Sequence, residues 1–187
     1  MATDSKTYVT AFNSYAINRV IGEGGAGCVF EATDSNGAVV AIKRLDYRQL
    51  TNERVKRFKN ETHFCLRNQH KNLITVQDYG VTDLNGKNCP FYVMPLYRET
   101  LRTLIRDKID PSQVVELFVQ MLDGVEAAHL QNVWHRDLKP ENVLFDRNSH
   151  TLVIADFGIA RFIKEVLYTL VETRPTTRLS QFPIYSP

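Results

Sequence analysis

The stretch Trp134–Phe145, WHRDLKPENVLF, constrains what this 187-residue chain can be more than any other part of it. Asp137, Lys139 and Asn142 stand two and then three residues apart, directly before an apolar run. Because a long segment with helical periodicity precedes them, we expect them in a loop, presented to solvent rather than buried in a strand. A further acid, Asp156, follows Asn142 by fourteen residues, at the end of a second apolar run.

These four polar side chains have the chemistry that phosphoryl transfer requires. Asp137 can accept a hydroxyl proton or orient the hydroxyl for attack. Lys139 can neutralise charge on a transferring phosphoryl group. Asn142 offers a neutral oxygen to a hard cation, and Asp156 offers a carboxylate that can bridge Mg²⁺ to phosphates. A lone Asp-Phe-Gly would be only a turn signal, but its distance behind HRDLKPEN makes chance a poor explanation.

A glycine-rich stretch near the N-terminus, GEGGAGCV, indicates contact with phosphate. Gly22, Gly24 and Gly27 lack a Cβ, so backbone amides here can approach phosphate oxygens closely. A dinucleotide-binding turn shares this glycine spacing but opens a helix, whereas Val29 and Phe30 continue as a strand. We therefore favour a glycine-rich hairpin lying over nucleotide phosphates, and a flexible hairpin without a ligand is the alternative.

Lys43 stands in the apolar run VVAIKRL, where a charged amine requires an anionic partner. Phosphate oxygens and a carboxylate could both serve. Glu61 is favoured as the carboxylate because it shares a predicted helix face with Phe58 and Cys65. Glu53 is the alternative, but a position at the helix start is explained more simply by the helix dipole. The other reading of Lys43, a surface lysine on an edge strand, fits the alternation of this run less well.

Short strands and one helix are expected in the first half of the chain, and helices with shorter strands in the second. The expected strands of the first half are Ser14–Gly22, Cys28–Asp34, Ala38–Leu45, Asn72–Gly80 and Pro90–Leu96. Between them, Thr51–Asn68 has helical periodicity, and Thr51 or Asn52 could cap it. The expected elements of the second half are the helices Glu99–Lys108 and Pro111–Gln131 and the strands Asn142–Asp146 and Thr151–Gly158. The division between the halves falls near Leu96–Arg98.

Composition indicates an ordinary globular protein, with 43% hydrophobic and 24% charged residues. The net charge of +2 argues against a nucleic-acid protein held by bulk charge. Cys28, Cys65 and Cys89 have neither metal-ligand nor CxxC spacing, which indicates a reducing compartment. The N-terminus has no secretion signal, and no apolar run approaches the roughly 20 residues that span a bilayer. We expect a cytoplasmic protein without membrane contact.

Together the motifs resemble the catalytic domain of eukaryotic-type Ser/Thr protein kinases, in the family's order, from about Tyr15 to Gly158. The resemblance implies an α+β, two-lobe fold: a five-stranded antiparallel N-lobe with one main helix, and an incomplete, mostly helical C-lobe. It implies an N-terminal extension over 1–14 and a kinase domain over 15–187, with the N-lobe at about 15–96 and the partial C-lobe at about 97–187. It also implies ATP and Mg²⁺ as cofactors, and a protein substrate with a Ser or Thr acceptor.

The same resemblance assigns roles to individual residues. The positions that match the family's catalytic residues are Asp137, Lys139, Lys43, Glu61 and Asn142, with His135 and Arg136 in the catalytic loop. Asn142 and Asp156 match its Mg²⁺ ligands. The positions implied in ATP binding are Ile21, Gly22, Glu23, Gly24, Gly25, Ala26, Gly27, Cys28, Val29, Ala41, Lys43, Met94, Pro95, Tyr97, Leu144 and Asp156.

Within that set, Met94 resembles the residue at the back of the nucleotide pocket, and Pro95–Tyr97 resembles the hinge. Pro95 has no N–H, but the hinge needs only the carbonyl there, so the amide of Tyr97 is expected to matter. Lys139 indicates Ser/Thr rather than Tyr specificity. Cys28 is expected to be small buried filler, with a reactive thiol as the alternative. Candidate phosphorylation sites are Thr169, Thr173, Thr176, Thr177 and Ser180.

The sequence departs from the family pattern after Gly158, because the chain stops at QFPIYSP, where the family continues with further helices. Two expectations follow from the resemblance. The long helix should expose an apolar patch over Val114–Leu130, which favours self-association or a partner, and peptide binding should be impaired. From the resemblance, we favour the function of a protein Ser/Thr kinase. The alternative is a nucleotide-binding module with weak or no catalytic activity. A small-molecule kinase of related fold fits HRDLKPEN less well, and a dinucleotide oxidoreductase fits less well still.

Overall fold

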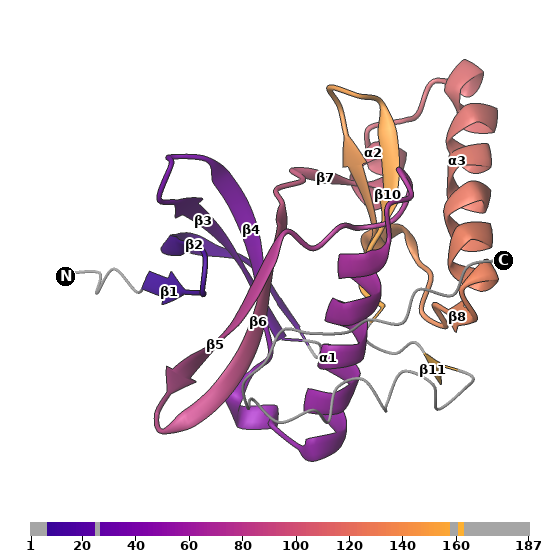
Figure 1. Cartoon of the computed structure of the whole chain (residues 1–187). Coiled ribbons are helices and arrows are strands. Elements are labelled where there is room, and N and C mark those ends of the chain that lie inside the picture. The colour runs from indigo at the N-terminus through magenta and orange to yellow at the C-terminus, as the bar shows by residue number, and fades with distance from the viewer. Residues whose placement is uncertain (1–6, 25–26, 158–160, 163–187) are drawn as a thin grey trace, which may run out of the picture.

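The structure, a computed structural model, describes residues 7–24, 27–157 and 161–162, with side chains described up to residue 157. A twisted antiparallel sheet forms the first half, and helix α1 (Asn52–Arg67) lies against one of its faces (Figure 1). Two helices and several short strands form the second half, on the right of Figure 1. The α+β, two-lobe architecture expected from the sequence is confirmed.

The sheet of the first half has six strands in the order β1-β2-β3-β4-β6-β5, one more than expected. Its strands are β1 (Thr7–Val9), β2 (Ser14–Gly24), β3 (Gly27–Asp34), β4 (Val39–Arg44), β5 (Asp78–Leu84) and β6 (Lys87–Pro95). The additional strand β1 lies in the segment expected to be an extension outside the sheet. It pairs antiparallel with β2, and Tyr8 at its centre is only 1% exposed. Burial of this aromatic ring accounts for the ordered edge strand.

The prediction of a strand over Asn72–Gly80 is wrong for residues 72–77, because β5 (Asp78–Leu84) begins only at Asp78. The preceding residues bury their apolar side chains in the core instead, with Leu73 2% and Ile74 0% exposed. Backbone hydrogen bonds join this connection to the second half: Ile74 N–H donates to the Ile154 carbonyl, and Ile154 N–H donates to the Asn72 carbonyl. The segment therefore ties the two lobes together rather than extending the sheet.

Helix α1 follows the sequence expectation closely. Thr51 caps its N-terminus by accepting a hydrogen bond from Arg54 N–H, and the backbone N–H of Asn68 closes its C-terminus. Its buried face carries Phe58, Glu61, Thr62, Phe64 and Cys65. A glutamate within an otherwise mainly apolar face points to a polar partner inside the fold, because a buried carboxylate without one is costly.

The second half is built around the long helix α3. Its elements are β7 (Glu99–Thr100), α2 (Leu101–Arg106), α3 (Pro111–Leu130), β8 (Val133–Trp134), β9 (Val143–Asp146), β10 (Thr151–Ile154) and β11 (Arg161–Phe162). The expected helix Glu99–Lys108 is shorter than predicted, because its first two residues pair with β9 as β7. A 3-10 turn over Pro140–Asn142 leads into β9 and completes the loop that precedes it.

Two apolar clusters occupy the two faces of the sheet. The larger lies under α1 and continues into the second half, where Val133, Val153 and Ile154 contribute to it. The other contains Tyr8, Tyr15, Cys28 and Phe30, on the opposite face. Because one cluster spans both halves, the orientation of the two lobes is fixed by packing as well as by the chain connection.

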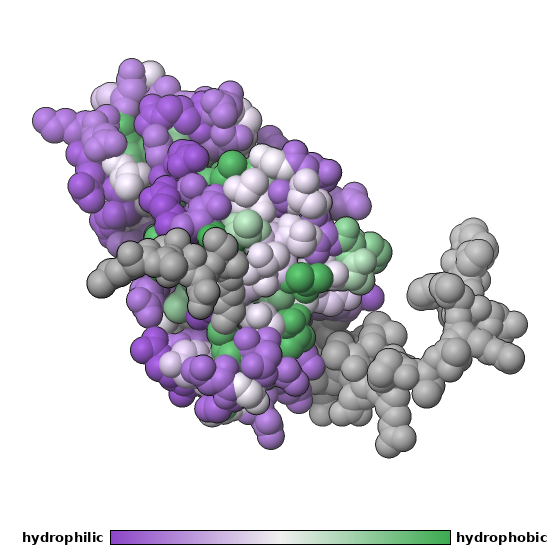
Figure 2. Space-filling model, turned by 90° about the vertical axis from the view of Figure 1, so that its left-hand side faces the viewer, coloured by the Kyte–Doolittle hydropathy of each residue, from purple (hydrophilic) through white to green (hydrophobic). Residues whose placement is uncertain are grey.

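The outer side of α3 is apolar, as expected from the sequence. Its exposed large apolar side chains are Val114, Val115, Phe118, Val119, Leu122 and Leu130, each close to half exposed or more. On the face shown in Figure 2, hydrophilic residues predominate and apolar residues form small groups. Within the described residues, no helix combines the length and the apolarity needed to span a membrane.

Candidate active site

A cavity of about 560 Å³ lies between the two halves of the molecule, within the size range of small-molecule sites. Residues of β2, β3, β4 and β6 line it on one side, and the loop before β9 and the segment after β10 line it on the other. Predicted site residues at its wall are Ile21, Gly22, Val29, Ala41, Lys43, Met94, Pro95, Tyr97, Asn142, Leu144 and Asp156. The structure therefore brings together most of the predicted nucleotide site.

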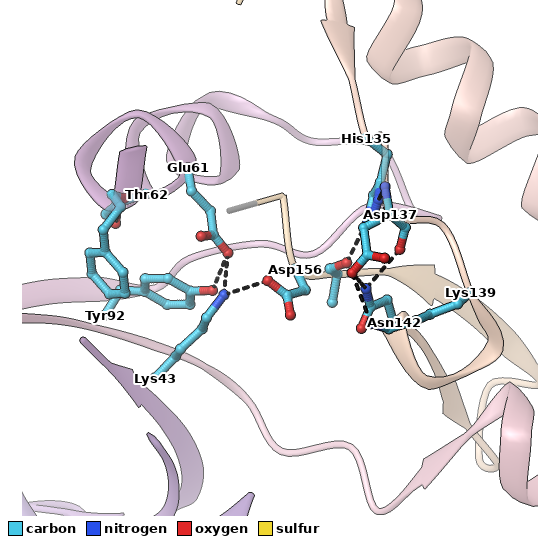
Figure 3. A network of polar contacts seen from close by, with 11 residues as sticks. Lys43, Glu61, Thr62, Tyr92, His135, Asp137, Lys139, Asn142 and Asp156 are labelled. Carbon is cyan, nitrogen blue, oxygen red and sulfur yellow. Dashed lines mark hydrogen bonds and ion pairs between the residues drawn. The ribbon is translucent and has the colours of Figure 1, made fainter. Parts of the chain in front are cut away.

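Lys43 forms the centre of a buried polar network at this cavity (Figure 3). Its Nζ lies 2.6 Å from Glu61 Oε1 and 3.0 Å from Asp156 Oδ1. Glu61 is thus the partner of Lys43, whereas the alternative, Glu53, lies at the exposed start of α1 and pairs with Arg57. A third group, the Tyr92 hydroxyl, donates to the same Glu61 oxygen over 2.8 Å. The network joins β4, α1, β6 and the segment after β10.

The protonation state of Lys43 follows from these partners. Burial alone would lower the pKa of its ammonium, but the carboxylates of Glu61 and Asp156 outweigh burial and raise the pKa above its usual value. Lys43 is therefore a fixed positive charge at the cavity wall. Such a charge suits an anionic ligand such as a phosphate group.

The loop 135–142 holds a second polar group, beside the first. Lys139 Nζ lies 2.9 Å from Asp137 Oδ2, and Asn142 Nδ2 donates to the Asp137 carbonyl over 2.8 Å and to its Oδ2 over 3.2 Å. The hydrogen bond from Lys139 is the main reason that the pKa of Asp137 lies below its usual value. Asp137 is therefore an ionised acceptor at neutral pH, positioned by both of its neighbours.

His135 connects this loop to the end of β10. Its Nδ1 accepts from Asp137 N–H, so its Nε2 carries the proton and donates to the Ala155 carbonyl over 2.8 Å. Ala155 N–H in turn donates to the Asn142 carbonyl over 2.9 Å. These bonds place Asn142 beside the segment that carries Asp156. Asp156 itself has φ of 66°, a strained conformation of the kind found at functional sites.

In the glycine-rich stretch, strand β2 pairs with strand β3 as far as Gly24 and Gly27, as predicted for a hairpin. Gly27 has φ of 129°, and a Cβ there would lie 2.2 Å from the Arg44 carbonyl oxygen, so glycine is required. Gly25 and Ala26 lie outside the described residues. Cys28 is 7% exposed in the cluster on the far face of the sheet, so its side chain does not line the cavity and acts as buried filler. Glu23 pairs with Arg48, outside the cavity lining.

The predicted hinge lies at the end of β6. Met94 pairs with Ala41 and Pro95 with Val40 across the β4–β6 ladder. Pro95 is the last residue of β6. Tyr97 follows at the cavity wall, which Leu144 of β9 also lines. The five predicted phosphorylation sites all lie outside the described residues.

The donors at the cavity fit a magnesium ion that arrives with phosphates. Asn142 uses its Nδ2 on Asp137, which leaves its carboxamide oxygen as the group it can offer to a cation. Asp156 adds a carboxylate. The described residues hold no cluster of three or more His, Cys, Asp or Glu side chains suited to a metal. One or two protein oxygens with phosphate oxygens and water is the usual arrangement for Mg²⁺.

Sequence reasoning missed several residues at this site. The sequence marks Tyr92 only as part of an apolar strand, although it lies directly opposite Lys43 in the β4–β6 register. Arg19 and Arg98, both at the cavity wall, pair with the Glu31 carboxylate at 2.8 Å and 3.5 Å. Nothing in the local sequence marks these residues, because their positions depend on pairing between distant segments.

Comparison with known proteins agrees with this geometry. A family profile described as the protein kinase domain matches residues 15–177. The chain is 30% identical over 94% of its length to the probable serine/threonine-protein kinase PknB of Corynebacterium glutamicum. It is 35% identical over 85% of its length to the serine/threonine-protein kinase pkn3 of Myxococcus xanthus, and 30% identical over 83% to PrkC of Bacillus subtilis.

The match covers only part of each relative. The chain spans 28%, 30% and 24% of the lengths of the PknB, pkn3 and PrkC proteins, respectively. Within this chain, the family match begins at Tyr15 and includes the cavity and both polar networks described above. The chain belongs to the protein kinase family.

Proposed function

We propose that this chain is an ATP-dependent protein serine/threonine kinase, which transfers the γ-phosphate of Mg-ATP to a Ser or Thr hydroxyl. The observation that carries the proposal is the position of Lys43. It lies between Glu61 and Asp156 at the wall of the cavity. A backbone hydrogen bond joins Asn142 to Ala155, next to Asp156, and the side chain of Asn142 donates to Asp137. A fixed cation and two oxygen donors for a metal thus line one cavity, and the ionised Asp137 is hydrogen-bonded to one of these donors, Asn142.

Each residue has a role that its contacts support. Lys43, held by Glu61, binds the α- and β-phosphates. Asn142 and Asp156 would hold Mg²⁺, which when bound supplies positive charge to the phosphate oxygens. Asp137 accepts a hydrogen bond from the acceptor hydroxyl and orients it toward the γ-phosphate. Lys139, at 2.9 Å from Asp137, neutralises charge on the transferring group.

The walls of the cavity suit the adenosine part of ATP. Ala41, Val29 and Leu144 supply apolar contacts from above and below, and Met94 closes the back. The carbonyl of Pro95 and the amide of Tyr97 are the groups that we assign to the adenine edge. Ile21 and Gly22 line the cavity, and Gly24, Gly25, Ala26 and Gly27 follow them in the sequence; we assign this stretch to the phosphates.

Specificity and location are also proposals. Lys139 after the catalytic acid and the names of the relatives support a Ser/Thr acceptor in a protein substrate. The three cysteines form no disulfide and are all buried, which supports a cytoplasmic location. The apolar outer face of α3 supports self-association or a partner.

The alternative is a nucleotide-binding module with weak catalysis. It is tested by Mg-ATP binding in a thermal-shift assay, together with phosphate incorporation measured by mass spectrometry. We expect the wild type to bind Mg-ATP and to incorporate phosphate, and Asp137→Ala to bind but not to incorporate. Binding without incorporation by the wild type would support the alternative. Incorporation that survives in Asp137→Ala would remove Asp137 from the mechanism.

A further inference from the structure

Tyr92 makes a contact that neither the sequence motifs nor the family match assigns. It lies in β6, 1% exposed, and its hydroxyl donates to Glu61 Oε1 over 2.8 Å. The same oxygen accepts from Lys43 over 2.6 Å. Glu61 is also 1% exposed, so within the described residues its carboxylate is held by two buried donors on two different strands (Figure 3).

The hydroxyl of Tyr92 acts as a donor and not as an acceptor here. Burial, and next the Glu61 carboxylate, raise the pKa of Tyr92 well above its usual value, so the phenol keeps its proton. An ionised carboxylate only accepts hydrogen bonds. The Tyr92–Glu61 bond is therefore charge-assisted and buried, the kind of hydrogen bond that contributes most to positioning.

The ring of Tyr92 holds α1 at a second point. It packs against Phe58 with ring centroids 5.2 Å apart, and Phe58 precedes Glu61 by three residues on the same helix face. Lys43 Nζ lies 5.7 Å from the centroid of the Tyr92 ring, because the two residues are direct cross-strand neighbours. One side chain thus contacts the helix, its glutamate and the lysine.

We propose that Tyr92 is a positioning residue, which holds Glu61 and helix α1 in the arrangement that presents Lys43 to the nucleotide. This inference rests on the proposed function for its effect on ATP, but its effect on α1 does not. Without the hydroxyl, Glu61 loses one of its two donors and α1 loses its polar anchor to β6. Outward movements of α1 would then leave Lys43 without its partner more often.

The variant Tyr92→Phe tests the inference, because it removes the hydroxyl and keeps the ring. Tyr15→Phe is the matched control: Tyr15 is 4% exposed and its hydroxyl donates to Asp78 Oδ2 over 2.7 Å, in the cluster on the other face of the sheet. Both variants delete a buried tyrosine–carboxylate hydrogen bond. Of the two bonds, only Tyr92–Glu61 involves a residue of α1.

The first measurement is hydrogen–deuterium exchange of the protein without nucleotide. We expect Tyr92→Phe to accelerate exchange of the α1 peptide that covers Phe58–Cys65 by about fivefold, and Tyr15→Phe to leave that peptide unchanged relative to the rest of the sheet. Equal acceleration of α1 in both variants, or none in Tyr92→Phe, would overturn the inference. Tyr92→Met, which also lacks the hydroxyl, replaces Tyr92→Phe if the latter does not fold.

The second measurement is a double-mutant cycle on Mg-ATP affinity. Tyr92→Phe should weaken binding about fivefold in the wild-type background and have no further effect in Glu61→Gln, because both changes act through the same carboxylate. Additive effects would show that Tyr92 does not act through Glu61. If the wild type binds no Mg-ATP, the proposed function fails, and the exchange measurement alone decides on Tyr92.

Discussion

Lys43 is a buried cation between two carboxylates, and its removal should affect the fold as well as the ligand. With Lys43→Met, Glu61 remains buried and, among the described residues, keeps Tyr92 as its donor. Breaking a buried ion pair typically costs about 3 kcal/mol of unfolding free energy. Urea unfolding measures this loss. Lys59→Met is the control, since Lys59 is exposed on α1 and should change stability little. A Lys43→Met protein as stable as the wild type would contradict the buried network.

Gly27 has a backbone conformation that other residues rarely adopt. Gly27→Ala should lower the unfolding free energy by about 3 kcal/mol, because the new Cβ would meet the Arg44 carbonyl oxygen and φ is 129°. Gly24→Ala serves as the control, since nothing lies within 4 Å of a Cβ there and its φ is not positive. We expect chemical denaturation to separate the two variants clearly. Equal stabilities would mean that the turn is not formed as described.

At the scale of elements, the connection from β4 to α1 depends on one acid. Asp46 is 4% exposed and accepts hydrogen bonds from the backbone and the side chain of Arg48 at the start of a 3-10 turn. The side-chain hydrogen bond from Arg48 is the main reason that the pKa of Asp46 lies below its usual value. A lowered folded-state pKa means that this contribution to stability is present above the unfolded-state pKa and is lost at lower pH.

Arg48→Gln should therefore lower the urea midpoint at pH 7. The difference from the wild type should shrink as the pH falls below about 3.9, the ordinary pKa of an aspartate, where the wild type loses the same contribution. Unfolding curves at several pH values provide the measurement. A difference that is constant across this range, or larger in acid, would exclude the Asp46–Arg48 interaction as its cause.

Elements with local signals were predictable from the sequence, and elements that depend on distant contacts were not. The bounds of α1 and α3 lie within one residue of expectation, because Thr51 caps the first and Pro111 opens the second. Strand β1 was missed because three residues form a strand here only through their pairing with β2 and the burial of Tyr8. Residues 72–77 were read as a strand because a buried apolar run gives the same pattern in a core connection.

The residues of the candidate site also fall into those that the local sequence marks and those that it does not. Motif spacing marks Asp137, Asn142 and Asp156 as candidates, and helical periodicity favours Glu61 over Glu53 because it places Glu61 on the buried face. Tyr92 could not be found, since its role depends on the register of β6 against β4. Motif patterns thus select the candidate polar residues, whereas the contacts around them are visible only in the structure.

At the scale of the whole molecule, the apolar outer face of α3 should promote association. Val115 is 72% and Phe118 is 53% exposed, one turn apart on the helix. We expect light scattering to show a mass that rises with concentration, and the double variant Val115→Glu, Phe118→Glu to reduce that rise without loss of helix content. A wild-type protein that stays a well-folded monomer at all concentrations would contradict this prediction.

The central claim concerns both lobes: Lys43 and Glu61 from one, and Asn142 and Asp156 from the other, surround one site for a nucleotide and its magnesium. Calorimetric titration of ATP with and without Mg²⁺, on the wild type and on Asp156→Ala, tests it most directly. We predict that Mg²⁺ strengthens ATP binding to the wild type about tenfold or more and has little effect on Asp156→Ala. ATP binding that is independent of Mg²⁺ in the wild type, or equally Mg²⁺-dependent in Asp156→Ala, would contradict the claim.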